Sequence, residues 1–90
     1  MVIDKGNINE ILIKHDPKGL IGFGAPLDEY MIEAEYLSNN IKEGISEKAI
    51  YNLAKENFKE RFGGLTLYEH LKLRRVAKDI GSQFSHQALN

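Results

Sequence analysis

The 90-residue sequence contains no cysteine, which excludes a disulfide framework, a thiolate zinc site and a cysteine nucleophile. It also lacks tryptophan, and its two prolines, Pro17 and Pro26, both lie in the first third of the chain. No apolar run approaches the roughly 20 residues that cross a bilayer, and the first residues lack the apolar stretch of a signal peptide. These absences predict a cytoplasmic protein that does not span a membrane.

The remaining composition is typical of one ordinary folded domain. Hydrophobic residues make up 42% and charged residues 28% of the chain, which does not resemble a disordered tail. We therefore predict a single helical domain over residues 1–90. Its net charge of −1 conceals two unlike halves, because residues 1–45 carry 4 basic and 8 acidic side chains whereas residues 46–90 carry 8 and 5. These charges either offset one another within the domain or give it an acidic face that can guide a partner.

Hydrophobic spacing predicts an all-α fold of about four helices. The first is expected over residues 3–14, with either Asp4 or Asn7 as its N-cap. The second is expected to begin near Pro26, whose fixed φ suits a first helical turn, and to close at Gly44. Its core-facing stripe is predicted to comprise Leu27, Tyr30, Met31, Ala34, Leu37 and Ile41.

The last two helices have clear entry signals. Ser46 is a predicted N-cap for a helix that runs to residue 61 or 62, where the following glycine pair stops it. Thr66 and Glu69 have the spacing of a capping box at the start of the fourth helix, which is expected to reach about residue 80. The segment 82–90 either extends this helix or frays.

A long loop containing glycine and proline is expected between the first two helices, over residues 16–26. Helix connections in bundles usually need about 2–8 residues, so this length suggests a role. The loop carries Leu20, Ile21 and Phe23, each of which would lose roughly 1.5–3 kcal/mol if it remained in water. We expect these side chains to tuck under the helices. The loop is either a packed lid over one end of the core or a binding site.

Carboxylates and a histidine gather around this loop. Together they could hold a hard divalent cation or perform acid–base chemistry. The candidate set for such a metal or enzymatic site is His15, Asp16, Asp28 and Glu29. In helical projection, however, Asp28 and Glu35 lie on one flank while Glu29 and Glu33 lie on the other, so the second helix alone does not build a metal site. In the alternative interpretation, the ring of His15 makes a structural hydrogen bond.

Ile32 and Tyr36 form a second apolar stripe, opposite the core stripe of the second helix. Either the helix is covered on both sides, or this stripe is an exposed contact for a partner or for a second copy of the chain.

Basic side chains mark the outer side of the predicted fourth helix. They are Lys72, Arg74, Arg75 and Lys78. The pattern admits nucleic-acid binding as a lesser alternative, but the chain lacks the overall basic excess of such domains, and Glu69 and Asp79 bracket the patch. No nucleophile constellation, phosphate loop or cofactor motif is present, so the sequence favours a binding protein over an enzyme and predicts no cofactor.

Two runs of residues resemble a known family. They are His15-Asp16-Pro17-Lys18-Gly19-Leu20 and Gly24-Ala25-Pro26-Leu27-Asp28-Glu29-Tyr30. This pattern resembles the YugE-like family, small bacterial helical proteins without an assigned biochemical function. The chain departs from the family pattern at His15, where the family has tryptophan, and at Met31, where it has aspartate. The resemblance implies an all-helical fold and no particular activity.

The resemblance also directs attention to the place where the loop meets the second helix. In one interpretation the parts are structural: Asp16 caps a turn, Asp28 caps the helix, and the buried Tyr30 bonds the loop through its hydroxyl. In the other they form a recognition surface. We predict a module that binds another protein or itself through this acidic surface. The candidate partner-binding residues are Asp16, Pro17, Asp28, Glu29, Tyr30, Ile32, Glu33 and Tyr36.

Overall fold

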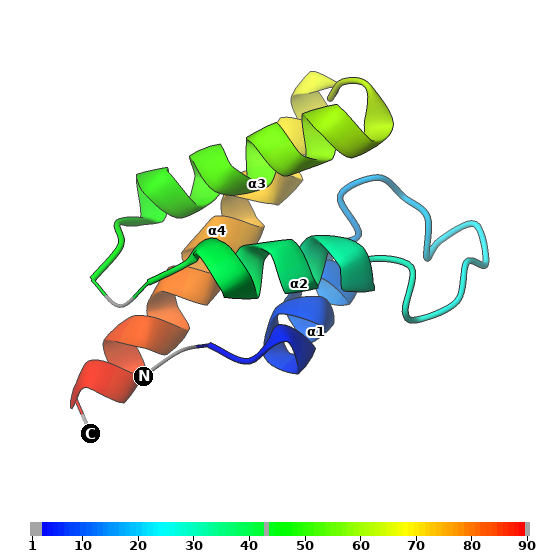
Figure 1. The fold of residues 1–90 in the computed structure, drawn as a ribbon. Coiled ribbons are helices and arrows are strands. Elements are labelled where there is room, and N and C mark those ends of the chain that lie inside the picture. The colour runs from blue at the N-terminus through cyan, green and yellow to red at the C-terminus, as the bar shows by residue number, and fades with distance from the viewer. Residues whose placement is uncertain (1–2, 43, 90) are drawn as a thin grey trace.

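A computed structural model describes the backbone of residues 3–42 and 44–89, and the side chains as far as Gln83. Within these residues it contains four helices and no strand, which confirms the predicted all-α class. The helices are α1 (Lys5–His15), α2 (Met31–Asn40), α3 (Glu47–Phe62) and α4 (Leu67–Leu89). The helix α1 packs on α2 and α4, and α3 packs on the same two helices, so α2 and α4 lie diagonally opposite each other (Figure 1).

Three helix starts follow from local capping chemistry. The carboxylate of Asp4 accepts a 3.0 Å bond from the backbone N–H of Gly6 at the start of α1, and Ser46 Oγ accepts a 3.1 Å bond from Ala49 N in α3. Before α4, Glu69 Oε1 accepts from Thr66 N and Thr66 Oγ1 accepts from Glu69 N, at 2.9 and 3.2 Å. The predicted capping box is therefore confirmed. Each of these bonds satisfies an N–H group that the helix itself leaves without a partner.

The second helix is shorter than predicted at both ends. It begins at Met31, because the backbone from Pro26 to Tyr30 forms turns in which Glu29 N bonds Pro26 O and Met31 N bonds Asp28 O, both at 3.0 Å. It ends at Asn40, after which the backbone of Ile41 is extended. The early turns remove Leu27 from the predicted core stripe and leave it 65% exposed. The rest of that stripe remains inside, with Met31 only partly buried.

The fourth helix is longer than the predicted end near residue 80. Its backbone continues through Gly81 to Leu89, so the alternative in which segment 82–90 extends the helix holds as far as the structure describes it. A glycine within a helix costs roughly 1 kcal/mol relative to alanine, and here tertiary packing overrides that preference. Gly81 lies against α3, where an added Cβ would stand 3.8 Å from Ile50 Cδ1.

The core is a single apolar cluster to which all four helices contribute. Its members are Ile3, Ile8, Ile11, Leu12, Tyr30, Ala34, Leu37, Ile41, Ile50, Ala54, Phe58, Leu73, Val76, Ala77 and Ile80. Of the loop side chains, Leu20 and Ile21 pack against this cluster as predicted, but Phe23 is 93% exposed. Tight turns explain the difference, because Phe23 N bonds both Gly19 O and Leu20 O at 3.2 Å and the chain reverses before the ring can reach the core.

None of the helices, as far as the structure describes them, combines the length and the apolar character needed to cross a membrane.

Candidate functional site

Asp16 organises the connection between α1 and α2. It ends α1 in a left-handed conformation (φ 46°), which a short polar side chain tolerates better than most. Its carboxylate accepts hydrogen bonds from Ile21 N at 3.1 Å, from Gly22 N at 2.9 Å and from Tyr30 Oη at 2.7 Å. Burial alone would raise the pKa of Asp16, but these bonds outweigh burial and hold the pKa below its ordinary value of 3.8.

Tyr30 carries the second half of this arrangement. Its ring is fully buried, with its centroid 5.9 Å from that of Phe58, while its hydroxyl also accepts a 3.0 Å bond from Lys18 N. Burial, together with the hydrogen bond to Asp16, raises the pKa of Tyr30 well above its ordinary value of 10. The structural interpretation is therefore confirmed for Asp16 and Tyr30. It is wrong for Asp28, since Tyr30 is the N-cap of α2 and no side chain among the described residues caps that helix by a hydrogen bond.

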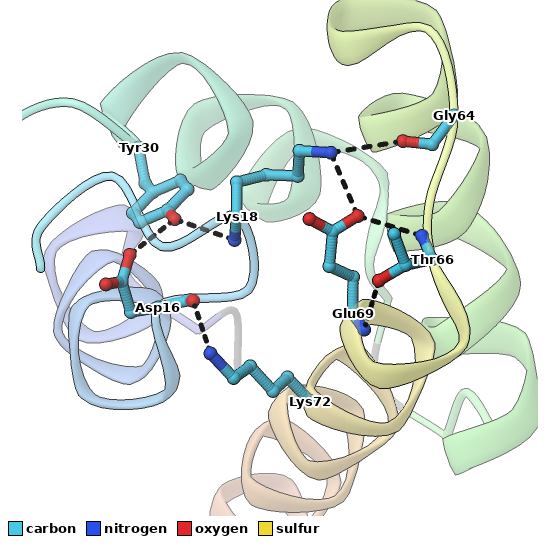
Figure 2. Close-up of polar contacts among 7 residues, drawn as sticks. All are labelled: Asp16, Lys18, Tyr30, Gly64, Thr66, Glu69 and Lys72. Atoms are coloured by element: carbon cyan, nitrogen blue, oxygen red, sulfur yellow. Dashed lines mark hydrogen bonds and ion pairs between the residues drawn. The ribbon is translucent and has the colours of Figure 1, made fainter. Parts of the chain in front are cut away.

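Two lysines tie this connection to α4 (Figure 2). Lys18 Nζ donates to Glu69 Oε1 at 3.0 Å and to Gly64 O at 3.2 Å, and Lys72 Nζ donates to Asp16 O at 3.2 Å. Burial would raise the pKa of Glu69, but the backbone bond from Thr66 and the contact with Lys18 lower it overall. The connection is thus bonded at both of its ends and to a distant helix, which makes it an ordered part of the fold.

The proposed metal or enzymatic set does not converge. His15 Nε2 lies 2.7 Å from Asp79 Oδ2 on α4, and Asp16 is committed to the connection. Burial would raise the pKa of Asp79, but the contact with His15, assisted by Lys14, lowers it. Among the residues described, which include His15, Asp16, Asp28 and Glu29, no group of three or more potential ligands could hold a metal ion.

Glu33 is an internal carboxylate, not a surface one. Its side chain is fully buried, and Oε2 accepts a 2.9 Å bond from Arg61 Nε on α3. Burial raises the pKa of Glu33, and the attraction of Arg61 offsets this only in part. Its Oε1 has no hydrogen-bond partner among the described residues. Glu33 therefore joins α2 to α3 and is not available to a partner.

Few of the predicted partner-binding residues remain at the surface. Pro17, like Tyr30 and Glu33, is buried, and Tyr36 is half-buried against the core. Asp28 and Glu29 are exposed in the turns before α2, and Ile32, three residues after Glu29, is 58% exposed. The second apolar stripe is thus divided, with Ile32 outside and Tyr36 partly covered. We use the name acidic–apolar face for four exposed residues that follow one another closely in the sequence: Leu27, Asp28, Glu29 and Ile32.

The outer surface of α4 carries the opposite charge. Arg74, Arg75 and Lys78 are exposed there, as sequence spacing predicts, whereas Lys72 is partly buried and lies 4.6 Å from the centre of the Tyr68 ring. Three large apolar side chains at the start of the same helix are also exposed. They are Leu67 at 80%, Tyr68 at 64% and Leu71 at 47%.

Sequence reasoning missed a polar pair between α3 and α4. Tyr51 Oη lies 2.7 Å from His70 Nδ1, and the side chains of Lys55 and Arg74 approach the Tyr51 ring to 5.8 and 5.9 Å. A hollow of about 570 Å³ lies beside Tyr51. Its walls mix acidic, basic and apolar groups, and they comprise Glu47, Lys48, Tyr51, Asn52, Arg74 and Ala77. No local pattern signals a contact between residues 19 positions apart on different helices.

No protein-family model, curated protein or solved structure matches this chain. The resemblance to the YugE-like family therefore stays a prediction.

Proposed function

We propose that this protein is a binding module of the cytoplasm that takes a basic, amphipathic segment of a partner protein on its acidic–apolar face. The observation that carries this proposal is the combination of two exposed aliphatic side chains, Leu27 at 65% and Ile32 at 58%, with the exposed carboxylates of Asp28 and Glu29. Covering exposed aliphatic groups with a partner is favourable in free energy, and carboxylates beside them favour a partner that carries positive charge.

The rigidity of the supporting structure favours binding at this face. The backbone of Leu27 is held by Asn9, whose Nδ2 donates to Leu27 O at 3.2 Å. Ile32 lies on α2, between the buried residues Tyr30 and Glu33. A face that is ordered before binding loses little conformational entropy when the partner arrives.

The acidic charge of the face is open to a partner. The neighbouring carboxylate of Glu33 is buried against Arg61, and that of Glu35 lies 3.7 Å from Lys5 Nζ. Asp28 and Glu29 are the exposed acidic groups closest in sequence to Ile32 that are not used in this way among the described residues. A partner with lysine or arginine beside leucine or isoleucine has the complementary chemistry.

Binding of a synthetic helical peptide made of leucine and lysine, followed by fluorescence anisotropy, tests this function. We expect Asp28→Asn with Glu29→Gln to weaken binding by about tenfold, because two carboxylates are lost from the contact. The matched control is Glu56→Gln with Glu60→Gln, which removes the same charge from exposed positions of α3 and should change the affinity little. A peptide of leucine and glutamate should not bind.

The apolar half of the face is tested separately. Ile32→Ser should also weaken binding of the peptide. The fold, followed by circular dichroism, should be retained because Ile32 is 58% exposed. Equal peptide binding by wild type, the Asp28/Glu29 variant and the Ile32 variant would show that this face is not the binding site.

A further inference from the structure

We propose that the partner is a second copy of this chain, which docks the outer surface of its α4 on the acidic–apolar face. The inference rests on the proposed function and identifies the basic, amphipathic segment that the function requires. The surface concerned consists of Leu67, Leu71, Arg74, Arg75 and Lys78, and we call it the basic–apolar face. Leu67, Leu71, Arg74 and Lys78 recur at intervals of three or four residues, and Arg75 lies four residues after Leu71, so all five share one side of the helix.

The two faces are complementary in composition. Each combines two exposed aliphatic side chains with charge of one sign, and the signs are opposite. Leu67 and Leu71, which are 80% and 47% exposed, correspond to Leu27 and Ile32, which are 65% and 58% exposed. Arg74 and Arg75 correspond to Asp28 and Glu29, and all four are exposed. Apolar contact surrounded by opposite charges is the composition expected of a specific, weak interface.

The two faces cannot meet within one molecule. The helices α2 and α4 occupy opposite corners of the bundle, with α1 and α3 between them, and α4 lies behind α2 in Figure 1. Among the described residues α2 and α4 are not in contact, so the two surfaces do not cover each other. They can meet only when the acidic–apolar face of one copy contacts the basic–apolar face of the next.

The halves of the chain keep part of their opposite charge at these surfaces. Ion pairs offset some charge across the halves, at Lys18 with Glu69, at Glu33 with Arg61, and at Lys14 with Asp79. Neither Asp28 and Glu29 nor Arg74 and Arg75 take part in the ion pairs among the described residues. The net charge of −1 means that whole molecules hardly repel one another, so local attraction can bring copies together.

A contact between two different faces is heterologous. Each copy still offers one free face of each kind after the contact forms, so assembly continues to a closed ring or to a short filament. The average mass of the assembly should therefore rise with protein concentration and should exceed the mass of a dimer. Association should weaken as salt rises from about 0.1 M to about 1 M, because the Debye length falls from about 10 Å to about 3 Å.

Charge-swapped variants in sedimentation equilibrium test the pairing. Asp28→Lys with Glu29→Lys, and separately Arg74→Glu with Arg75→Glu, should each leave the protein monomeric at concentrations where wild type associates. An equimolar mixture of the two variants should associate, because each supplies the charge that the other lacks. The variant with all four substitutions, which has the wild-type net charge, should associate by itself with at least about a tenth of the wild-type affinity.

Two control variants carry the same charge changes at exposed positions of α3. Glu56→Lys with Glu60→Lys, and Lys48→Glu with Lys59→Glu, should keep the association of wild type. The milder pair Asp28→Asn and Glu29→Gln provides a second measurement if a charge-reversed variant does not fold, and it should weaken association by about tenfold.

The results separate this inference from the proposed function. A wild-type protein that stays monomeric at every concentration, or a variant with all four swaps that does not recover association, overturns the pairing between copies. If the leucine–lysine peptide still binds in a manner that depends on Asp28 and Glu29, the binding function stands and its partner is another protein. A wild-type protein that neither binds the leucine–lysine peptide nor self-associates would overturn both proposals.

Discussion

The hydroxyl of Tyr30 donates a 2.7 Å hydrogen bond to the carboxylate of Asp16 and thereby joins the end of α1 to the start of α2. The same carboxylate holds the backbone N–H groups of Ile21 and Gly22, and the same hydroxyl accepts from Lys18 N. This pair fixes the connection whose residues Leu27, Asp28 and Glu29 belong to the acidic–apolar face, so the order of that face depends on it.

Tyr30→Phe should destabilise the protein by about 1.5–3 kcal/mol, because a hydrogen bond to a charged group is lost and Lys18 N loses its acceptor. The aromatic ring remains in the core, so the loss of stability measures the contribution of the hydroxyl. Urea unfolding measures the change, and an NMR titration should show the pKa of Asp16 rising towards 3.8. Tyr36→Phe is the control, since the hydroxyl of Tyr36 makes no hydrogen bond among the described residues. Equal stability of wild type and Tyr30→Phe would contradict this assignment.

Acid should remove the contribution of Asp79 to the stability of the fold. Its pKa is lowered in the folded protein from the ordinary value of 3.8, so its stabilisation is present above that value and is lost as pH falls through the folded pKa. The stability difference between wild type and Asp79→Asn should therefore be largest near neutrality and shrink towards about pH 2. Urea unfolding at a series of pH values measures it. The exposed Asp28→Asn serves as the control, and a difference for Asp79→Asn that does not vary with pH would refute the prediction.

Glu33 should show the opposite pH dependence. Burial raises its pKa above the ordinary 4.5, so its contribution is fully present below 4.5 and is lost as pH rises through the folded pKa. Glu33→Gln should therefore gain stability relative to wild type as pH rises, while an amide oxygen can still accept from Arg61. Thermal unfolding at several pH values is the measurement, with the exposed Glu35→Gln as control. If the stability of Glu33→Gln relative to wild type instead falls as pH rises, the carboxylate of Glu33 is better solvated than the structure indicates.

The helix starts were predictable because capping is local. Ser46 bonds Ala49 N, and Thr66 and Glu69 bond each other, so every participant lies within three residues of its partner. A sequence displays such spacing directly. The start of α2 was not predictable in this way, because Pro26 is compatible both with a first helical turn and with the turns that the chain adopts.

The burial of individual carboxylates could not be predicted. Asp16, Asp28 and Glu33 all belong to the same acidic stretch of sequence, but Asp16 is enclosed by hydrogen bonds, Glu33 is buried and Asp28 is exposed. The deciding contacts are distant. Glu33 pairs with Arg61, 28 residues further along the chain, and nothing near Glu33 in the sequence signals that pair. The predicted acidic surface therefore shrinks to the smaller acidic–apolar face.

The glycine pair after α3 separates backbone strain from packing. Gly63 caps α3 with φ at 84°, a conformation that costs an L-residue roughly 1–2 kcal/mol, whereas Gly64 has no such φ. An added Cβ at either position meets no atom of the described residues within 4 Å. Gly63→Ala should therefore destabilise by about 1–2 kcal/mol, and Gly64→Ala should be neutral or stabilise by about 0.4–1 kcal/mol through the unfolded chain. Urea unfolding of both variants compares them. Equal losses at the two positions would mean that the space around the turn, and not the left-handed backbone of Gly63, limits substitution.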